Sequence, residues 1–231
     1  MPIHVTEKIK SLGVFEGFED SEVASLLEGA EEKLLKHRAT LFKADTDAHF
    51  FALVLEGAVK LVKPSPSGDD VIVLFALPGD VIGALIMVQD KSTYPVSVIA
   101  LGETVVLKIP RRTFQESWQK NQIAMRRVNA LIYSRMTDFH DQKSMTKTPL
   151  PRKIARQIVS LIDRYGTDAG TILPIPLTRQ EIADAVGSTV ESVIRVMSSW
   201  SQLGIIRTSG QHIEILKMDK VLEILSGKLE A

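Results

Sequence analysis

The chain of 231 residues contains no cysteine. This absence excludes disulfide bonds, cysteine nucleophiles, thiolate zinc sites and iron–sulfur clusters held by cysteine. A surplus of basic charge is also missing, because 28 Lys and Arg residues balance 28 Asp and Glu residues. Composition alone therefore gives no support for a nucleic-acid partner, and any phosphate contacts would have to come from local placement of charge.

Long hydrophobic runs are absent as well. Residues 1–11 lack the apolar core of a signal peptide, and the most apolar span, residues 71–88, is interrupted by Pro78, Gly79 and Asp80. We therefore expect no membrane partner and a cytoplasmic location. Hydrophobic residues make up 45% of the chain and charged residues 24%, which is ordinary for one large or two modest globular domains.

The first half of the chain predicts a β-rich domain behind a helical start. Residues 1–36 are expected to be helical, since Val23, Leu26, Leu27 and Leu34 recur at helical spacing. Short β-branched runs then alternate with turn-prone sequences around Gly57, residues 67–69, 78–80 and 101–103, which favours a jelly roll or β-roll. The expected strands are residues 50–55, 58–62, 71–77, 96–100 and 104–109.

Residues 111–145 return to helical character. Positions spaced three and four apart form a seam at Met125, Val128, Ile132, Arg135 and Phe139, which is apolar except where Arg135 interrupts it. This seam fits either a helix lying on its own β-domain or a helix pairing with a second copy, and we favour the dimer helix. Within it, Arg135 is expected to pair with Asp138 three residues later.

The last third predicts a winged helix-turn-helix. Thr178 and Glu181 have the spacing of a capping box, Gly187 supplies a tight turn, and Ser188 or Thr189 caps a second helix in which Glu191 could complete another box. A hairpin around Ser209 and Gly210 follows as the wing. The domains expected are an α+β arrangement of a β-roll sensor (1–111), a dimerisation helix (112–147) and a DNA-binding domain (148–231), with a proline hinge at 148–151.

The second helix of this motif carries the candidate base contacts. Arginine can bond guanine O6 and N7 together, and glutamate can accept a bond from cytosine N4. The alternative is that Glu191 and Arg195 form an ordinary surface salt bridge at i,i+4 spacing. We favour DNA because of the complete capped context, and predict these contacts: Thr178, Arg179, Thr189, Val190, Glu191, Ser192 and Arg195.

These residues also carry a family resemblance. Residues 178–183, 186–187 and 190–195 closely resemble the winged helix-turn-helix of the CRP/FNR regulators, and residues 55–61, 78–83 and 94–98 resemble that family's β-roll. The resemblance implies a homodimeric, effector-responsive transcription factor that binds double-stranded DNA at a palindromic site and works with RNA polymerase. An enzyme is not expected, because no P-loop, HExxH or Gly-x-Ser-x-Gly motif is present.

The recognition helix is more similar to the FNR branch than to the cyclic-AMP receptors. Those receptors usually have arginine before the glutamate, where this chain has Val190. The resemblance therefore implies a half-site with a TGA-like core read by Glu191 and Arg195. The FNR branch often has serine before the arginine, where this chain has Ile194, so the outer base pairs of the half-site stay open.

The sensor departs from the cyclic-nucleotide binders that it resembles. Their phosphate cassette carries Gly-Glu-Leu and then Arg-Ser or Arg-Thr, where this chain has Gly83-Ala84-Leu85 and Tyr94-Pro95. Their Thr-Ser pair beneath the adenine corresponds to Asp138 and Phe139. Losing both charged contacts predicts that cyclic AMP does not bind in the family's usual way.

The effector itself is left unidentified. The candidate pocket residues are Gly83, Ala84, Leu85, Tyr94, Pro95, Arg135, Asp138 and Phe139. They could surround a less charged ligand, or merely fill the roll, and Arg135 could replace the missing phosphate contact. Haem is a further alternative with His4, His37, His49 or His140 as ligand, although no pair of histidines has metal-motif spacing and no metal site is predicted. The other functional alternative is a module with this fold that binds a cyclic nucleotide or another small ligand and contacts protein instead of DNA.

Overall fold

The computed structural model describes residues 7–64, 70–144, 147–165, 172–173 and 175–229. The chain forms two compact units, one of residues 1–63 with 75–137 and the other of residues 64–74 with 138–231. The boundary between residues 137 and 138 lies within the helix that runs from Gln122 to Ser144. No helix in the described ranges is both long and apolar enough to cross a membrane.

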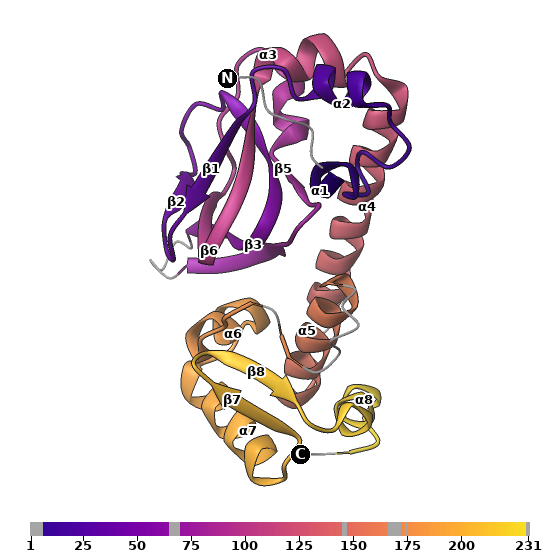
Figure 1. Cartoon of the computed structure of the whole chain (residues 1–231). Coiled ribbons are helices and arrows are strands. Elements are labelled where there is room, and N and C mark those ends of the chain that lie inside the picture. The colour runs from indigo at the N-terminus through magenta and orange to yellow at the C-terminus, as the bar shows by residue number, and fades with distance from the viewer. Residues whose placement is uncertain (1–6, 65–69, 145–146, 166–171, 174, 230–231) are drawn as a thin grey trace. The chain divides into compact units, whose positions relative to one another are not determined.

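The first unit is built on an antiparallel sheet in the order β1-β6-β3-β4, with β2 also pairing with β6 and β5 with β3 (Figure 1). This arrangement confirms the expected β-roll. Its described strands are β1 (Glu31–Leu35), β2 (Thr40–Phe42), β3 (Phe50–Pro64), β4 (Asp70–Ala76), β5 (Val81–Ile82) and β6 (Ser97–Pro110).

Two expected turns are bulges inside continuous strands. Gly57 lies within β3 and Gly102 within β6, both at positive φ, and the pairing register shifts around Gly57. A Cβ at Gly57 would lie 2.3 Å from the carbonyl oxygen of Glu103, so only glycine fits where the two strands approach. The prediction of separate strands at 50–55 and 58–62, and at 96–100 and 104–109, was therefore wrong.

The prediction of helix throughout residues 1–36 was also wrong. The described helices here are α1 (Glu7–Lys10) and α2 (Asp20–Leu26), and residues 31–35 are strand β1. Gly29 at φ +67° follows α2 and redirects the chain into the sheet. In β1 the alternation of a strand leaves Leu34 57% exposed while Leu35 is buried.

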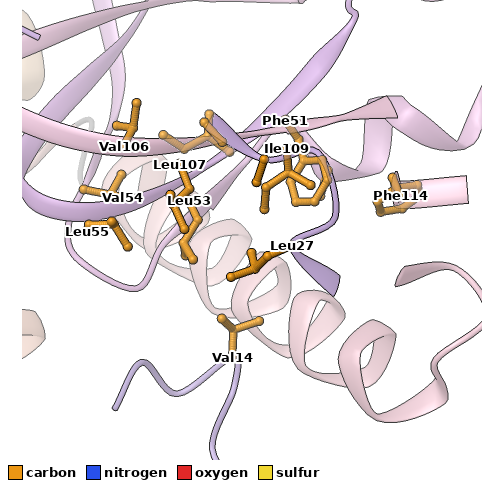
Figure 2. Packing of buried hydrophobic residues seen from close by; sticks show 14 of the residues in the cluster. Val14, Leu27, Phe51, Leu53, Val54, Leu55, Val106, Leu107, Ile109 and Phe114 are labelled. Atoms are coloured by element: carbon orange, nitrogen blue, oxygen red, sulfur yellow. The ribbon is translucent and has the colours of Figure 1, made fainter. Parts of the chain in front are cut away.

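The core lies between the sheet and the helices around it. Side chains from β3 and β6, including Phe51, Leu53 and Leu107, meet Val14 and Leu27 from the N-terminal segment (Figure 2). Edge-to-face aromatic contacts between Phe51 and Trp118 help to fix this packing. The remaining described helices of this unit are η1 (Ala84–Val88), α3 (Arg111–Thr113), η2 (Phe114–Trp118) and α4 (Gln122–Ser144).

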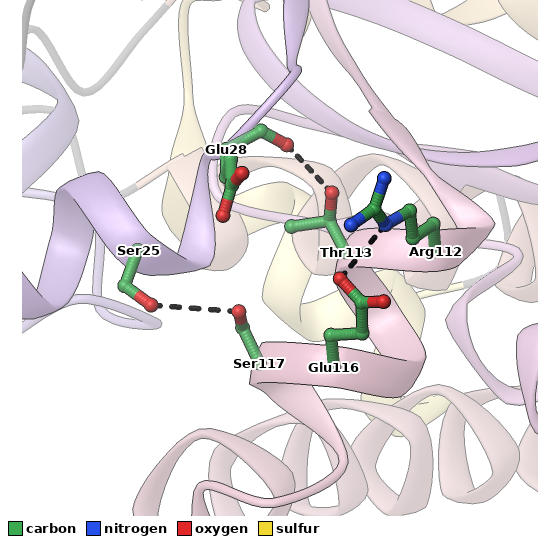
Figure 3. Close-up of polar contacts among 6 residues, drawn as sticks. All are labelled: Ser25, Glu28, Arg112, Thr113, Glu116 and Ser117. Atoms are coloured by element: carbon green, nitrogen blue, oxygen red, sulfur yellow. Dashed lines mark hydrogen bonds and ion pairs between the residues drawn. The ribbon is translucent and has the colours of Figure 1, made fainter.

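Polar contacts connect α2 and the residues just after it to the short helices α3 and η2, which follow β6 (Figure 3). The Thr113 hydroxyl donates to the Glu28 carbonyl oxygen at 2.6 Å, and the Ser25 hydroxyl donates to that of Ser117 at 3.4 Å. The Trp118 indole donates to the Leu26 carbonyl oxygen at 2.6 Å. The bonds from Thr113 and Trp118 satisfy carbonyl groups at the end of α2 that the helix leaves free.

Three residues of the seam that was predicted to face a partner pack instead in the core of their own unit. Val128 is fully buried in the core cluster, while Met125 and Ile132 pack against that cluster from α4. The opposite face of α4 exposes other apolar side chains, since Ile123 is 47% and Tyr133 75% exposed. The helix therefore has two apolar faces, and the expected seam is the one that covers the β-roll.

The second unit confirms the winged helix-turn-helix. Helix α5 packs against α6, α7 and α8, and the hairpin β7–β8 follows α7. Buried Ile158, Ile182, Val193 and Ile213 form part of its core. The elements are α5 (Leu150–Tyr165), α6 (Arg179–Val186), α7 (Val190–Gln202), β7 (Ile206–Ser209), β8 (His212–Ile215) and α8 (Met218–Ser226).

Candidate DNA-reading site and sensor cassette

The first helix of the motif starts as the sequence predicts. The Thr178 side chain accepts a bond from the Glu181 backbone at 3.1 Å, and Glu181 accepts one from the Thr178 backbone at 2.9 Å, which completes the capping box. Gly187 ends α6 at φ +64°, and the Ser188 amide donates to the Ala183 carbonyl oxygen. This geometry fixes the turn that places α7.

The cap of α7 is Thr189, not Ser188. Its hydroxyl accepts from the Ser192 amide at 3.3 Å and donates to the Ser192 hydroxyl at 3.1 Å. The third helical position is therefore Ser192, and the expected second capping box with Glu191 was wrong. Because Glu191 lies one position earlier, its carboxylate is not used in the cap.

The two faces of α7 differ sharply. Val193, Met197 and Trp200 are fully buried against the rest of the unit, whereas Glu191 and Arg195 are exposed. Neither Glu191 nor Arg195 makes an ion pair or a side-chain hydrogen bond with any residue that the structure describes. The surface salt bridge considered above is thus not formed, and both charged groups face solvent. Val190 and Ser192 are half-buried beside them.

Arg179 links the start of α6 to the wing. Its guanidinium donates to the Thr208 hydroxyl on β7 at 2.9 Å, and burial lowers its pKa from the ordinary value. The wing turns at Gly210 and Gln211, both at positive φ, one residue later than the sequence suggested. Sequence reasoning missed Thr208, because a contact 29 residues away leaves no local signal.

In the β-roll, the cassette begins at Gly83, which has φ +82° and precedes η1. Ala84 is buried, but Leu85 is 47% exposed and Pro95 is also exposed. The candidate pocket residues of this segment therefore do not converge on one interior surface. Met87, fully buried in the core, fills the roll as the simpler alternative expected.

Tyr94 is a core residue. Its ring stacks on Phe42 with centroids 3.7 Å apart, and its hydroxyl donates to the Phe50 carbonyl oxygen at 2.6 Å while accepting from the Phe50 amide at 3.3 Å. Burial raises the pKa of the phenol above its ordinary value of 10.0. The hydroxyl therefore both donates and accepts a hydrogen bond within the protein, and these are the bonds that a ligand would need from it.

Arg111 is an arginine of the cassette region that sequence reasoning missed. From the start of α3 its guanidinium donates to the Ala48 carbonyl oxygen at 3.0 Å, to the Ser92 hydroxyl at 2.7 Å and to the Gln89 carbonyl oxygen. It therefore ties the segment after η1 to the rest of the roll. The N–H groups of the Arg111 guanidinium thus donate to acceptors within the protein itself.

Arg135 pairs with Asp80. Its guanidinium Nη2 lies 3.0 Å and its Nε 3.1 Å from Asp80 Oδ1, and the other carboxylate oxygen accepts the Leu77 amide at 2.8 Å. Only 8% of the Asp80 side chain and 21% of the Arg135 side chain are exposed. The expected partner Asp138 and the pocket candidate Phe139 have side chains outside those that the structure describes.

The described histidines do not belong to a cluster of metal-binding side chains. No group of three or more His, Cys, Asp or Glu side chains that could hold a metal occurs among the described residues. His37 and His49 are exposed, and the Nδ1 of His37 accepts a bond from the Gly102 amide at 3.0 Å. His4 lies outside the described ranges, so the haem alternative gains no support from these contacts.

A β-roll followed along the chain by a long helix and a winged helix-turn-helix defines a DNA-binding transcription regulator. Residues 32–121 match the family model of the cyclic nucleotide-binding domain, and residues 152–224 match that of the Crp-like helix-turn-helix domain. The transcriptional activator protein anr of Pseudomonas aeruginosa is 30% identical over 85% of this chain and 81% of its own length. The chain belongs to the CRP/FNR family of transcriptional regulators.

Other relatives agree with this assignment. The CRP-like cAMP-activated global transcriptional regulator of Mycobacterium tuberculosis is 23% identical over 93% of this chain and 97% of its own. The solved structure of FixK2 from Bradyrhizobium japonicum shares the fold with a TM-score of 0.73 at 23% identity, over 84% of this chain and 96% of that one. The relatives from Pseudomonas aeruginosa and Mycobacterium tuberculosis are named as transcriptional regulators, which confirms the prediction of a transcription regulator.

Proposed function

We propose that the protein acts as a homodimer that recognises a palindromic site with TGA-containing half-sites. The observation that carries this proposal is the pair Glu191 and Arg195, both exposed near the N-terminal end of α7 and both unpaired within the described part of the chain. That end of the second helix reaches the bases in this motif. Arg195 reads guanine and Glu191 reads cytosine, while Thr178, Arg179 and Thr189 lie where the backbone would be contacted.

The dimer forms through the outer face of α4. Ile123, Ala130 and Tyr133 lie at seven- and three-residue steps on the face opposite the buried Val128, and Thr137 continues the stripe. Such spacing supports a helix pair related by a two-fold axis. A two-fold dimer presents two copies of α7, which matches a palindromic DNA site.

The sensor responds to an effector other than a cyclic nucleotide, and the DNA-bound dimer works with RNA polymerase. One relative is named as cAMP-activated. This chain has Ala84 and Tyr94 where cyclic-nucleotide binders place their charged contacts, and Arg135 is engaged by Asp80. Using Arg135 for a phosphate would require breaking that buried pair.

Binding to DNA is tested with the full chain and a duplex carrying two inverted TGA half-sites. Two protomers should bind each duplex, with affinity far above that for random DNA and falling steeply with salt. Binding that is absent or insensitive to salt in every condition would contradict DNA recognition and favour a protein partner.

The dimer is tested by sedimentation. Tyr133→Asp places a charge on the proposed interface and should give monomers with weakened DNA binding. Asn129→Asp adds the same charge at the edge of the exposed face of α4 and should leave the dimer intact. Dissociation by both variants, or by neither, would contradict the assigned face.

A further inference from the structure

The exposed face of α7 that carries Glu191 and Arg195, here called the reading face, has one large apolar side chain. Ile194 is 46% exposed, while the other exposed residues near it on α7 are polar: Glu191, Arg195 and Ser198. A β-branched residue gains nothing at an exposed helical position from intrinsic propensity. A single exposed apolar residue is ordinary on a protein surface, so exposure alone does not indicate a function for Ile194. Its position within the reading face does.

The spacing along α7 places Ile194 beside the base-reading groups. Ile194 comes three positions after Glu191, which puts the two side chains next to each other on one face of the helix. It is also the residue before Arg195, yet the neighbouring Val193 is fully buried, so the helix turns Ile194 outward and Val193 inward. A duplex close enough for Glu191 and Arg195 to touch bases would therefore cover Ile194.

The chemistry of the major groove leaves one partner for such a side chain. Isoleucine neither donates nor accepts a hydrogen bond, so it cannot distinguish bases by their polar edges. The 5-methyl group of thymine is the apolar group that the bases display in this groove. We infer that Ile194 reads a thymine methyl group at a base pair adjoining the one that Glu191 contacts, and so sets an outer position of the half-site. This inference rests on the proposed DNA-binding function.

Replacing thymine by uracil removes only the methyl group and keeps the hydrogen-bonding edge. The full chain is titrated with duplexes carrying inverted TGA half-sites, first with each base pair at the flanking positions and then with each thymine replaced singly by uracil. We expect a preference for thymine at one flanking pair, and about fourfold weaker binding per half-site when it becomes uracil.

Two variants separate the role of Ile194 from that of its neighbours. Ile194→Ala should bind the thymine duplex more weakly and should bind thymine and uracil duplexes equally. Leu203→Ala is the matched control, since it shortens an exposed apolar side chain at the C-terminal end of α7, away from the predicted DNA contacts, and should keep the discrimination at that thymine. A double-mutant cycle compares the affinities of the wild-type chain and Ile194→Ala for the thymine and uracil duplexes. It gives the coupling free energy between the side chain and the methyl group.

Each outcome decides between the two proposals. If the wild-type chain binds the TGA duplex specifically but binds every uracil duplex equally well, the reading of thymine by Ile194 is overturned and DNA recognition stands. If Ile194→Ala still distinguishes thymine from uracil, another residue reads the methyl group and the inference is likewise overturned. If no duplex is bound specifically, the proposed function itself fails.

Discussion

The two units of the molecule differ in whether selected charged side chains are bonded within the protein or face solvent. In the β-roll, the groups that a ligand would need are held by the protein, Arg111 by backbone carbonyl oxygens and Arg135 by Asp80. In the helix-turn-helix, Glu191 and Arg195 extend into solvent with no partner in the described part of the chain. The proposed DNA-reading surface on α7 therefore has charged groups available for contact, whereas the arginines of the β-roll are already bonded within the protein.

This difference has an energetic meaning. A DNA contact made by an exposed, unpaired arginine costs only desolvation and side-chain ordering, because no protein bond is broken first. A ligand that recruited Arg135 would have to compete with a carboxylate that is almost wholly buried, and leaving that carboxylate alone would cost several kcal/mol. The proposed effector would therefore have to bind without taking over these groups.

The largest effect is expected at the reading surface. Arg195→Ala should weaken binding by about 1–3 kcal/mol per half-site, or about 2–6 kcal/mol for the two half-sites of the TGA palindrome, since a bidentate contact with guanine is lost in each. Gln202→Ala, at the exposed C-terminal end of the same helix, serves as the control. Affinity is measured by fluorescence anisotropy against specific and random duplexes, and an unchanged ratio between them would remove Arg195 from the reader.

A smaller effect, on stability instead of affinity, is expected in the sensor. Arg135→Leu should lower the free energy of unfolding by about 2–4 kcal/mol, because Asp80 is left buried without its cation. Each unit contains one of the two tryptophans, so Trp118 fluorescence in a Trp200→Phe background follows the β-roll alone. The measurement is urea unfolding.

Two further variants sharpen this test. Ser134→Ala changes an exposed neighbour on α4 and should leave the unfolding midpoint in place. Combining Asp80→Asn with Arg135→Leu should cost less than the sum of the single changes, because the neutral amide needs no cation and can still accept from Leu77. Strict additivity would show that the pair does not couple the turn before β5 to α4.

The contrast between the units also explains what the sequence could predict. The helix-turn-helix was predicted closely because its signals are local, with Thr178 and Glu181 three residues apart and Gly187 at the turn. The glycines of the β-roll gave a local signal too, but a bulge and a turn look alike in sequence. Only the approach of the strand carrying Glu103 and Thr104 identifies Gly57 as a bulge.

The candidate sensor residues were harder to predict, because their partners are distant in sequence. Asp138 is the natural partner for Arg135 by helical spacing, and its side chain lies outside those that the structure describes. The pairing of Arg135 with Asp80, 55 residues away, leaves no local signal in the sequence. The two apolar faces of α4 pose the same difficulty. Val128 and Tyr133 each belong to a regular stripe, and the sequence does not say which stripe the sheet covers.

A modest effect is expected at the aromatic centre of the roll. Tyr94→Phe should lower the free energy of unfolding by about 0.5–1.5 kcal/mol at neutral pH, because the bond to the Phe50 carbonyl oxygen is lost. Burial raises the pKa of the folded phenol above 10.0, so the unfolded chain loses this proton first as pH rises. Stability from Tyr94 is therefore complete below pH 10.0 and declines above it.

The measurement compares urea unfolding of both proteins across that range. The wild-type chain should lose its advantage over Tyr94→Phe as the pH rises beyond 10.0. Tyr133→Phe, at a tyrosine that is 75% exposed, provides the matched change outside the core. A difference between wild type and Tyr94→Phe that stays constant with pH would contradict the assigned burial effect.

The smallest effect is expected from cyclic AMP. With Ala84 and Tyr94 in the cassette and Arg135 held by Asp80, we expect a Kd of about 1 mM or weaker, so 1 mM nucleotide stabilises the fold by at most about 0.4 kcal/mol. For a chain of this size that raises Tm by no more than about 2 °C. A Kd near 10 µM would instead give about 2.7 kcal/mol and a rise of at least 5 °C. Calorimetry with and without nucleotide separates these cases, and the larger rise would mean that the cassette can rearrange to bind a phosphate despite its internal bonds.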